Sequence, residues 1–155
     1  VTTNVKLILK LKQTIIMEKY LYFRSNAAVA QDDDETNGST VYPVSSFRGA
    51  VSGTSTALGA VTDDPDALSL YFTPKGHIAA GAAGDVNDAA GDNVDVVVVA
   101  ITTDNNQKAV LKSIIQSMNG GPHSDGFVEI FDGVSGNKVD GDIEGVTIVH
   151  TVAAD

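Results

Sequence analysis

The stretch Val94–Thr103, VDVVVVAITT, decides the fold of this chain. Valine, isoleucine and threonine favour extended strands because their branched β-carbons fit a pleated surface. Four successive valines break the alternation that a half-exposed strand would show, which indicates burial on both faces. The stretch is therefore predicted to be a central strand of a sheet.

The next segment, Asp104–Asn119, carries the one helical pattern in the sequence. Asp104 is an expected N-cap, and Gln107 three residues later would complete a capping box. Apolar residues recur at a spacing that predicts one buried helix face: Val110, Leu111, Ile114, Ile115 and Met118. The run Asn119-Gly120-Gly121-Pro122 ends the helix, with glycine suited to the cap and proline unable to continue.

Shorter β-rich runs lie on both sides of this pair. Strands are predicted at 20–23, 40–44, 67–73, 127–131 and 146–152, and Pro43 favours an edge position for the second of them. The segment Ser45–Thr56 is expected to be a loop or a weak strand, and Asp63–Asp66 a turn. The Gly/Ala/Asp-rich segment Gly76–Asn93 is expected to be a long surface loop.

The predicted order is therefore β-β-β-β-α-β-β. A single helix cannot supply the crossovers of a parallel sheet, so most strand pairs are expected to be antiparallel. The predicted fold class is α+β and β-rich: a small sandwich or partly open barrel with one amphipathic helix packed on it.

Length and composition narrow the classes of protein. The 155 residues suit one domain, and 43% apolar residues exceed what a disordered chain would carry. The absence of cysteine excludes disulfides, zinc–thiolate sites and thiol catalysis. A net charge of −10 makes nucleic acid an unfavourable partner. No apolar run has the length of a membrane span, so no transmembrane segment is expected.

The charge is unevenly distributed. Residues 1–24 carry five basic side chains and one acidic side chain, a net +4, whereas residues 25–155 carry five basic and nineteen acidic ones, a net −14. A basic arm on an acidic body can attract its own body, another subunit or a polyanion. A basic edge strand, protected by lysine from unwanted pairing, is the alternative.

The chain is expected to comprise two parts, residues 1–16 and residues 17–155. Residues 1–16 alternate apolar side chains with Lys6, Lys10 and Lys12 and form a basic N-terminal extension, which would be a strand if ordered. Interrupting lysines make this a poor signal peptide. Residues 1–16 can also be explained by a gene start that was assigned too early, in which case Met17 is the natural first residue. Residues 17–155 are expected to form a single β-rich domain.

No cofactor is expected, and calcium is the one ion for which candidate ligands can be suggested, since oxygen-rich loops suit this ion. The first loop contains the acidic run Asp32–Glu35, and the second spans Gly84–Asn93. A weaker third set comprises Asp132, Asn137, Asp140 and Asp142. The candidate ligands of the first two loops are Asp32, Asp34, Glu35, Asp85, Asn87, Asp88 and Asp92. Solvated acidic loops are the alternative interpretation for each of them.

Catalytic patterns are missing from the sequence. The histidines His77, His123 and His150 show no metal-binding spacing. The run His123-Ser124-Asp125 is contiguous, whereas a working triad converges from separate segments. Phosphate-binding glycine motifs are also absent. We therefore expect that the protein is not an enzyme and has no catalytic residues.

Two segments carry a resemblance to a known group of proteins. Met17–Arg24, MEKYLYFR, is followed by a run of aspartates, and Asn119–Val128 reads NGGPHSDGFV. From Met17 onward the chain resembles small uncharacterised structural proteins of marine tailed phages, notably those of cyanobacteria. The resemblance implies a virion-associated protein, located on the virion or in the host cytoplasm during assembly. It supplies no active site.

Two functional hypotheses follow. The first is a non-enzymatic structural or decoration protein that self-associates, with Tyr20, Tyr22 and Phe23 at subunit contacts and other virion proteins as further partners. High salt in seawater would screen repulsion between such acidic subunits. The alternative is a small β-barrel binding module for Ca²⁺, a glycan or RNA.

Overall fold

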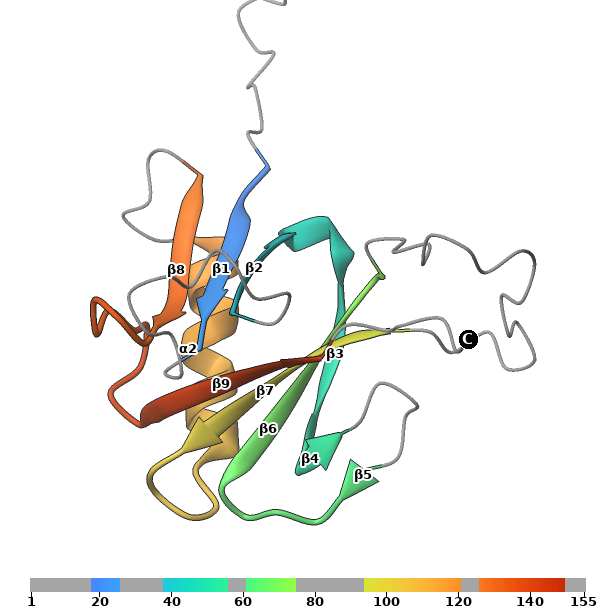
Figure 1. Cartoon of the computed structure of the whole chain (residues 1–155), viewed down its shortest axis with the longest axis vertical. Coiled ribbons are helices and arrows are strands. Elements are labelled where there is room, and N and C mark those ends of the chain that lie inside the picture. Colours follow the sequence, from blue (N-terminus) through green and yellow to red (C-terminus); the bar gives the residue numbers. More distant parts are fainter. Residues whose placement is uncertain (1–17, 26–37, 56–60, 75–93, 121–125, 150–155) are drawn as a thin grey trace, which may run out of the picture.

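The structure is a computed structural model, and it describes residues 18–25, 38–55, 61–74, 94–120 and 126–149. These residues form a β-rich fold with one α-helix, in which the strands are divided among three sheets (Figure 1). The predicted β-rich α+β class with mainly antiparallel pairing is confirmed. The described strands do not close into a barrel.

The larger sheet has four antiparallel strands in the order β3-β6-β7-β9, namely Phe47–Ser52, Ala67–Phe72, Asp95–Ile101 and Ile143–Val149. The valine-rich strand β7 lies between β6 and β9, so its predicted central position is confirmed. Val96, Val97 and Val99 are completely buried, as the run of valines indicated. Successive residues of a strand point to opposite faces, so the sheet is covered on both sides at this strand.

The smaller sheet has the order β2-β1-β8 and contains the one parallel pair among the described strands. Strand β1 (Tyr20–Arg24) pairs antiparallel with β2 (Ser39–Pro43) and parallel with β8 (Phe127–Asp132). Pro43 lies on an edge strand, as predicted. The register shifts after Tyr22, so that Ile130 is an extra residue of β8, and Phe23 then pairs with Phe131 and Arg24 with Asp132.

The segment Ser45–Thr56 differs from its expected loop or weak strand. It contains a short 3₁₀ turn η1 (Val44–Ser46), the whole of β3 and the two-residue strand β4 (Thr54–Ser55), which pairs with β5 (Val61–Thr62). The buried Ser69 hydroxyl donates to the Gly53 carbonyl and accepts from the Ser55 amide. Seven strands therefore precede the helix, not the predicted four, because β3 pairs with β6 and the short strands β4 and β5 pair with each other.

Helix α2 (Gln107–Asn119) confirms the predicted helix, but its start and its buried face need correction. Asp104 is not the N-cap: Asn105 has a φ of 62°, which no α-helix contains, so the helix begins after Asn106. The Gln107 side chain does not complete a capping box with Asp104, because its Nε2 donates to the Pro65 carbonyl (2.5 Å). Ile115 is exposed, because the helix packs through Val110, Ile114 and Met118, spaced at four residues.

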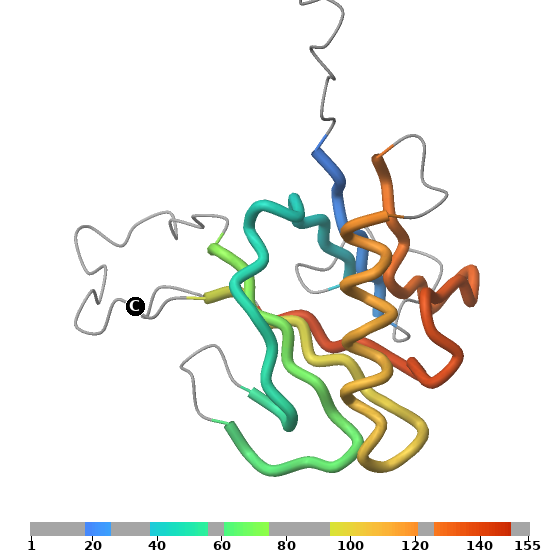
Figure 2. Tube along the Cα trace, turned by 180° about the vertical axis from the view of Figure 1, so that it is seen from behind, coloured from blue at the N-terminus to red at the C-terminus, as the bar shows by residue number. Residues whose placement is uncertain are grey.

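One continuous hydrophobic core joins both sheets and the helix. Helix α2 lies behind the strands in Figure 1 and in front of them in Figure 2, so it covers one side of the molecule. An aromatic group comprising Phe23, Tyr42, Phe72 and Phe47 lies where the two sheets meet, and the rings of Tyr42 and Phe72 stack at 4.2 Å. Within the described residues, no helix has both the length and the apolar character to cross a membrane.

Candidate functional site

The β2-β1-β8 sheet presents one face to the core and one face outward. Side chains alternate along each strand, and the register aligns the outward residues in three rows across the sheet. Each row is given in the order β2, β1, β8. The rows are Pro43, Tyr20 and Phe127; then Val41, Tyr22 and Glu129; then Ser39, Arg24 and Asp132. The outer face therefore changes from apolar and aromatic at one end to charged at the other.

The aromatic end of this face is its most exposed part. Tyr20 is 44% exposed and Phe127 is 40% exposed, and they are directly paired between β1 and β8. The rings of Tyr22 and Phe127 lie 5.3 Å apart in a tilted arrangement, which is a favourable aromatic geometry. We call Tyr20, Tyr22 and Phe127 the aromatic face. Adjacent exposed aromatic side chains commonly mark interaction sites, because their burial by a partner removes apolar area from water.

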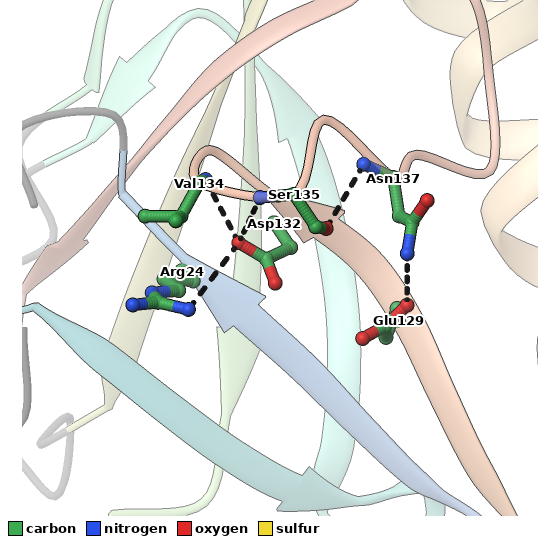
Figure 3. Close-up of polar contacts among 6 residues, drawn as sticks. All are labelled: Arg24, Glu129, Asp132, Val134, Ser135 and Asn137. Atoms are coloured by element: carbon green, nitrogen blue, oxygen red, sulfur yellow. Dashed lines mark hydrogen bonds and ion pairs between the residues drawn. The ribbon is translucent and has the colours of Figure 1, made fainter. Parts of the chain in front are cut away.

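The charged end of the same face is compensated internally (Figure 3). Asp132 Oδ1 accepts hydrogen bonds from the amides of Val134 (2.8 Å) and Ser135 (3.2 Å), and Arg24 Nη1 lies 3.8 Å from the same oxygen. Burial of Asp132 opposes its charged form, but the two amides and the Arg24 guanidinium outweigh this effect and lower the pKa of the carboxyl below its ordinary value. Asp132 thus stabilises the turn that follows β8.

A second polar contact continues this arrangement. Asn137 Nδ2 donates to Glu129 Oε2 (2.8 Å), and the main-chain amide of Asn137 donates to Ser135 Oγ (3.2 Å), as Figure 3 shows. The main chain of this turn also returns to β8, since the Asp132 amide donates to the Asn137 carbonyl (2.9 Å). The turn after β8 is therefore fixed against the strand by both side-chain and main-chain bonds.

A buried polar pair lies beneath the sheet, between the two sheets. The Tyr42 hydroxyl donates to Asp95 Oδ2 (2.8 Å), and neither side chain is exposed to solvent. Burial raises the pKa of the Tyr42 hydroxyl well above its usual value, and the Asp95 carboxylate contributes in the same direction. Tyr42 belongs to β2 and Asp95 to β7, so this hydrogen bond joins the small sheet to the large one.

Acidic side chains from three separate segments lie at the end of the molecule opposite the start of β1 and β8. The loops 63–66 and 102–106 and the turn 140–144 are linked by main-chain hydrogen bonds: Ile101 N to Asp66 O (2.7 Å), Asn105 N to Pro65 O (2.9 Å) and Thr102 N to Asp142 O (2.9 Å). We call this region the acidic end and define it by its carboxylates: Asp63, Asp64, Asp66, Asp104, Asp142 and Glu144. The loops 63–66 and 102–106 lie at the bottom of Figure 1, whereas strands β1 and β8 begin near the top.

The carboxylates of the acidic end differ in their partners. Asp142 accepts from the side chains of Thr103 and Asn106, and Asp64 accepts from Thr54 Oγ1 (2.9 Å) and the Asp66 amide (3.0 Å). Asp66, in contrast, meets another carboxyl. A side-chain hydrogen bond with Asp104 raises the pKa of Asp66, and the negative charges of Asp104, Asp64 and Glu144 add to this effect. This part of the acidic end is a site of mutual repulsion.

The structure separates the three residues that were expected at subunit contacts. Tyr20 and Tyr22 point outward in the aromatic face, but Phe23 is completely buried and packs against Tyr42 and Phe72. Phe23 is corrected to a core residue, because the alternation along β1 directs it to the inner face. Its place in the outward set is taken by Phe127, which the sequence did not identify as an interface residue.

The calcium candidates are mostly outside the described residues. This applies to Asp32, Asp34, Glu35, Asp85, Asn87, Asp88 and Asp92, and also to the basic extension 1–16. The third set is described: Asp132 bonds to its own turn, Asp140 accepts from Ser113 Oγ (2.5 Å), and Asp142 bonds to the loop before α2. In the described part of the chain, no three or more His, Asp or Glu residues are arranged to hold a metal ion.

Two features were missed by the sequence analysis for different reasons. The exposure of Phe127 could have been found from the alternation in FVEIF, which directs Phe127, Glu129 and Phe131 to one face of an undistorted strand. The bulge in β8 changes this facing, because Phe131 is buried and Asp132 takes the outward position. The side-chain contact between Asp66 and Asp104 connects two loops that are far apart in sequence, so no local sequence pattern could predict it.

Comparison with protein-family models, with curated proteins and with solved structures gives no match to this chain. Functional inference therefore depends on the arrangement of the two ends described above.

Proposed function

We propose that this protein is a non-enzymatic structural protein that self-associates through its aromatic face. A role as a decoration or building protein of a tailed-phage particle is the context that the resemblance at Met17–Arg24 and Asn119–Val128 implies. The observation that carries the proposal is the outward position of Tyr20, Tyr22 and Phe127 side by side on one small sheet.

The physical argument concerns the area removed from water. Aromatic side chains are large, and their burial between subunits contributes more than that of most other residues. Val41 and Pro43 continue the same face on β2, so the apolar surface extends across the full width of the sheet. The sheet itself is held by the core beneath it and by the Tyr42–Asp95 bond, so it can present this surface without rearrangement.

Electrostatics favour this face over the rest of the described surface. Arg24 is paired with Asp132, and Glu129 is hydrogen-bonded to the neutral Asn137, so the three outward rows hold one basic and two acidic side chains, a net charge of −1. The protein as a whole carries −10, which opposes association through an acidic surface. A contact at the aromatic face brings two copies together with less repulsion.

The test is the solution mass of the full chain and of the double variant Tyr20→Ser, Phe127→Ser, measured by light scattering after size exclusion. We expect a mass above that of the 16.1 kDa chain for the wild type and a shift to the monomer for the variant. Ile115→Ser is the matched control, because Ile115 is also an exposed apolar residue but lies on helix α2. It should leave the mass unchanged.

The same measurement in Ca²⁺ and then in EDTA distinguishes the alternative function. A wild-type chain that is monomeric at every concentration, and that gains thermal stability with Ca²⁺, contradicts self-association and supports a calcium-binding module.

A further inference from the structure

We infer that the outer edge of strand β3 pairs with the same edge of a second copy, so that the four-stranded sheets of two copies join into one continuous sheet. The pairing is antiparallel and two-fold symmetric, with Val51 opposite Val51 of the other copy. This surface lies on the larger sheet and is separate from the aromatic face, so the inference goes beyond the proposed function. Because only a few residues of each copy take part, the contact is weaker than a standard interface and forms at high protein concentration.

The main-chain groups of β3 point alternately toward β6 and away from it. In an antiparallel pair, successive residues alternate between bonding to the neighbouring strand and pointing to the other side. The Gly53 amide donates to the Ala67 carbonyl (2.9 Å), and Val51 has the same direction because it lies two residues earlier. The amides and carbonyls of Ala50 and Ser52 therefore point outward. Within the described residues, no main-chain hydrogen bond satisfies these outward groups.

A bulge limits the regular part of this edge to three residues. The register shifts between Phe47 and Gly49, so Arg48 is an extra residue of β3, and Gly49 has a φ of 136°. A bulge bends its strand and interrupts regular pairing. Residues 50–52 follow the bulge in unbroken register with β6, so they offer a short, straight edge.

The other outer edges of the two larger sheets are covered or interrupted in the described part of the chain. The turn after β8 returns to that strand, where the Asp132 amide donates to the Asn137 carbonyl (2.9 Å). Val146 and Ile148 of β9 are only 6% and 2% exposed, so this edge is buried. Strand β2 contains Pro43, which has no amide hydrogen. Strand β3, at one end of the order β3-β6-β7-β9, is half-exposed or exposed along its length (Figure 1).

The open edge of β3 is complementary to itself, which identifies a second copy as its occupant. With Val51 on the two-fold axis, Ala50 of one copy lies opposite Ser52 of the other. Such a pair exchanges hydrogen bonds in both directions, so every outward amide obtains an acceptor. The two Val51 side chains then meet in a non-hydrogen-bonded position, where contacts between β-branched side chains are favourable.

Charge also permits this pairing. Strand β3 contains no acidic residue, and its one charged side chain, Arg48, lies outside the paired stretch. Two copies that meet here avoid the repulsion that a chain of net charge −10 creates at acidic surfaces.

The test is disulfide trapping of the variant Val51→Cys. The chain contains no cysteine, so a disulfide can form only between two copies. A non-hydrogen-bonded antiparallel pair places its Cα atoms about 4.5 Å apart, which is within the range that a disulfide spans. Thr147→Cys is the matched control, because Thr147 is exposed in the same row of the sheet but on the opposite edge strand. Diamide oxidises the thiols by accepting their two hydrogens, and non-reducing electrophoresis measures the covalent dimer.

Val51→Cys should give at least about tenfold more covalent dimer than Thr147→Cys, because disulfide formation requires specific geometry. Adding Ser52→Pro should reduce the yield toward that of the control. This change removes an outward amide hydrogen and leaves the pairing with β6, since proline is tolerated on the open side of an edge strand. An unchanged urea midpoint shows that this variant keeps the fold.

Equal yields from Val51→Cys and Thr147→Cys would overturn the inference. A yield that Ser52→Pro does not reduce in the folded chain would overturn it as well. The changes Tyr20→Ser and Phe127→Ser, added to Val51→Cys, separate this inference from the proposed function. The covalent dimer should persist in that background, and its loss would show that the β3 edge is no independent contact. A wild-type chain that is monomeric in light scattering while Val51→Cys is trapped as a dimer contradicts the proposed function and supports the pairing of β3.

Discussion

Two regions of this molecule, the charged end of the small sheet and the acidic end, affect the ionisation of their carboxylates in opposite ways. At the charged side of the small sheet, Asp132 is enclosed by two backbone amides and the Arg24 guanidinium, and its pKa is lowered. At the acidic end, Asp66 shares a hydrogen bond with Asp104 among further acids, and its pKa is raised. The first carboxylate stabilises the fold by being charged, whereas the second is less favourable when charged.

This difference indicates which carboxylates stabilise the fold through their negative charge and which do not. A carboxylate that is already compensated within the protein gains little from another cation. Carboxylates that repel each other are stabilised when one of them is neutralised or when a cation approaches. Removal or protonation of each kind should therefore change stability in opposite directions.

The largest effect is expected for Asp132→Ala. The change removes the oxygen that accepts hydrogen bonds from the Val134 and Ser135 amides, and it leaves Arg24, whose side chain is 18% exposed, without this carboxylate. Breaking such a largely buried pair should destabilise the fold by about 2–4 kcal/mol. The urea midpoint measures this loss. Asp132→Asn, which retains an acceptor oxygen, should lose less, and equal losses for both variants would contradict the role of the amide bonds.

A somewhat smaller loss is expected for Tyr42→Phe. Asp95 is buried between the sheets, and the variant deprives it of the hydroxyl at 2.8 Å while the ring remains stacked on Phe72. Removing one partner of a buried charged acceptor costs about 1–3 kcal/mol. Tyr71→Phe, in the half-buried position before Phe72, provides the control in the same denaturation series and should change stability little. A neutral Tyr42→Phe would show that the bond does not join the sheets energetically.

Asp66→Asn should have the opposite sign and the smallest size. The amide keeps a hydrogen bond to Asp104 and removes one negative charge from a repulsive group, so the variant should be slightly more stable than the wild type at neutral pH. Asp63→Asn removes an exposed charge nearby and serves as the comparison. Destabilisation by Asp66→Asn would contradict the repulsion assigned to this end.

The pH dependence of these differences separates the two ends further. The folded state lowers the pKa of Asp132, so its contribution is present above the unfolded pKa and is lost as pH falls through the folded value, below 3.8. The folded state raises the pKa of Asp66, so the cost of its charge is relieved as pH falls through a value above 3.8.

Denaturation of both asparagine variants between pH 7 and pH 3 tests this order. The stability gap between Asp66→Asn and the wild type should close at the higher pH, and the gap for Asp132→Asn at the lower pH. The reverse order would contradict the assignment.

Much of the fold could be predicted from local patterns. The four valines of β7, the four-residue spacing in α2 and the proline of β2 each report a strong physical preference, and each places its element correctly. The pattern was weaker at Phe47–Ser52, because serine and glycine obtain their place in β3 from pairing with β6 and not from their own propensity.

The candidate site was predicted less well, because it depends on pairing between distant segments. Tyr20 and Tyr22 were identified from a strand rich in aromatics, but which of its residues face outward follows only from the register with β2 and β8. The start of α2 was misplaced since Asn105 adopts a left-handed conformation held by the Pro65 carbonyl, a contact made across the fold.

The most direct measurement of association through the aromatic face is cross-linking of two single variants, Ser45→Cys and Asp63→Cys. The sequence contains no cysteine, so each variant carries one thiol, and a short bis-maleimide can join only two copies of the chain. Ser45 is exposed beside Glu18, which precedes β1, and Asp63 is exposed at the acidic end. The account predicts a covalent dimer from Ser45→Cys and none from Asp63→Cys. A dimer from Asp63→Cys alone, or no dimer from Ser45→Cys, would contradict it.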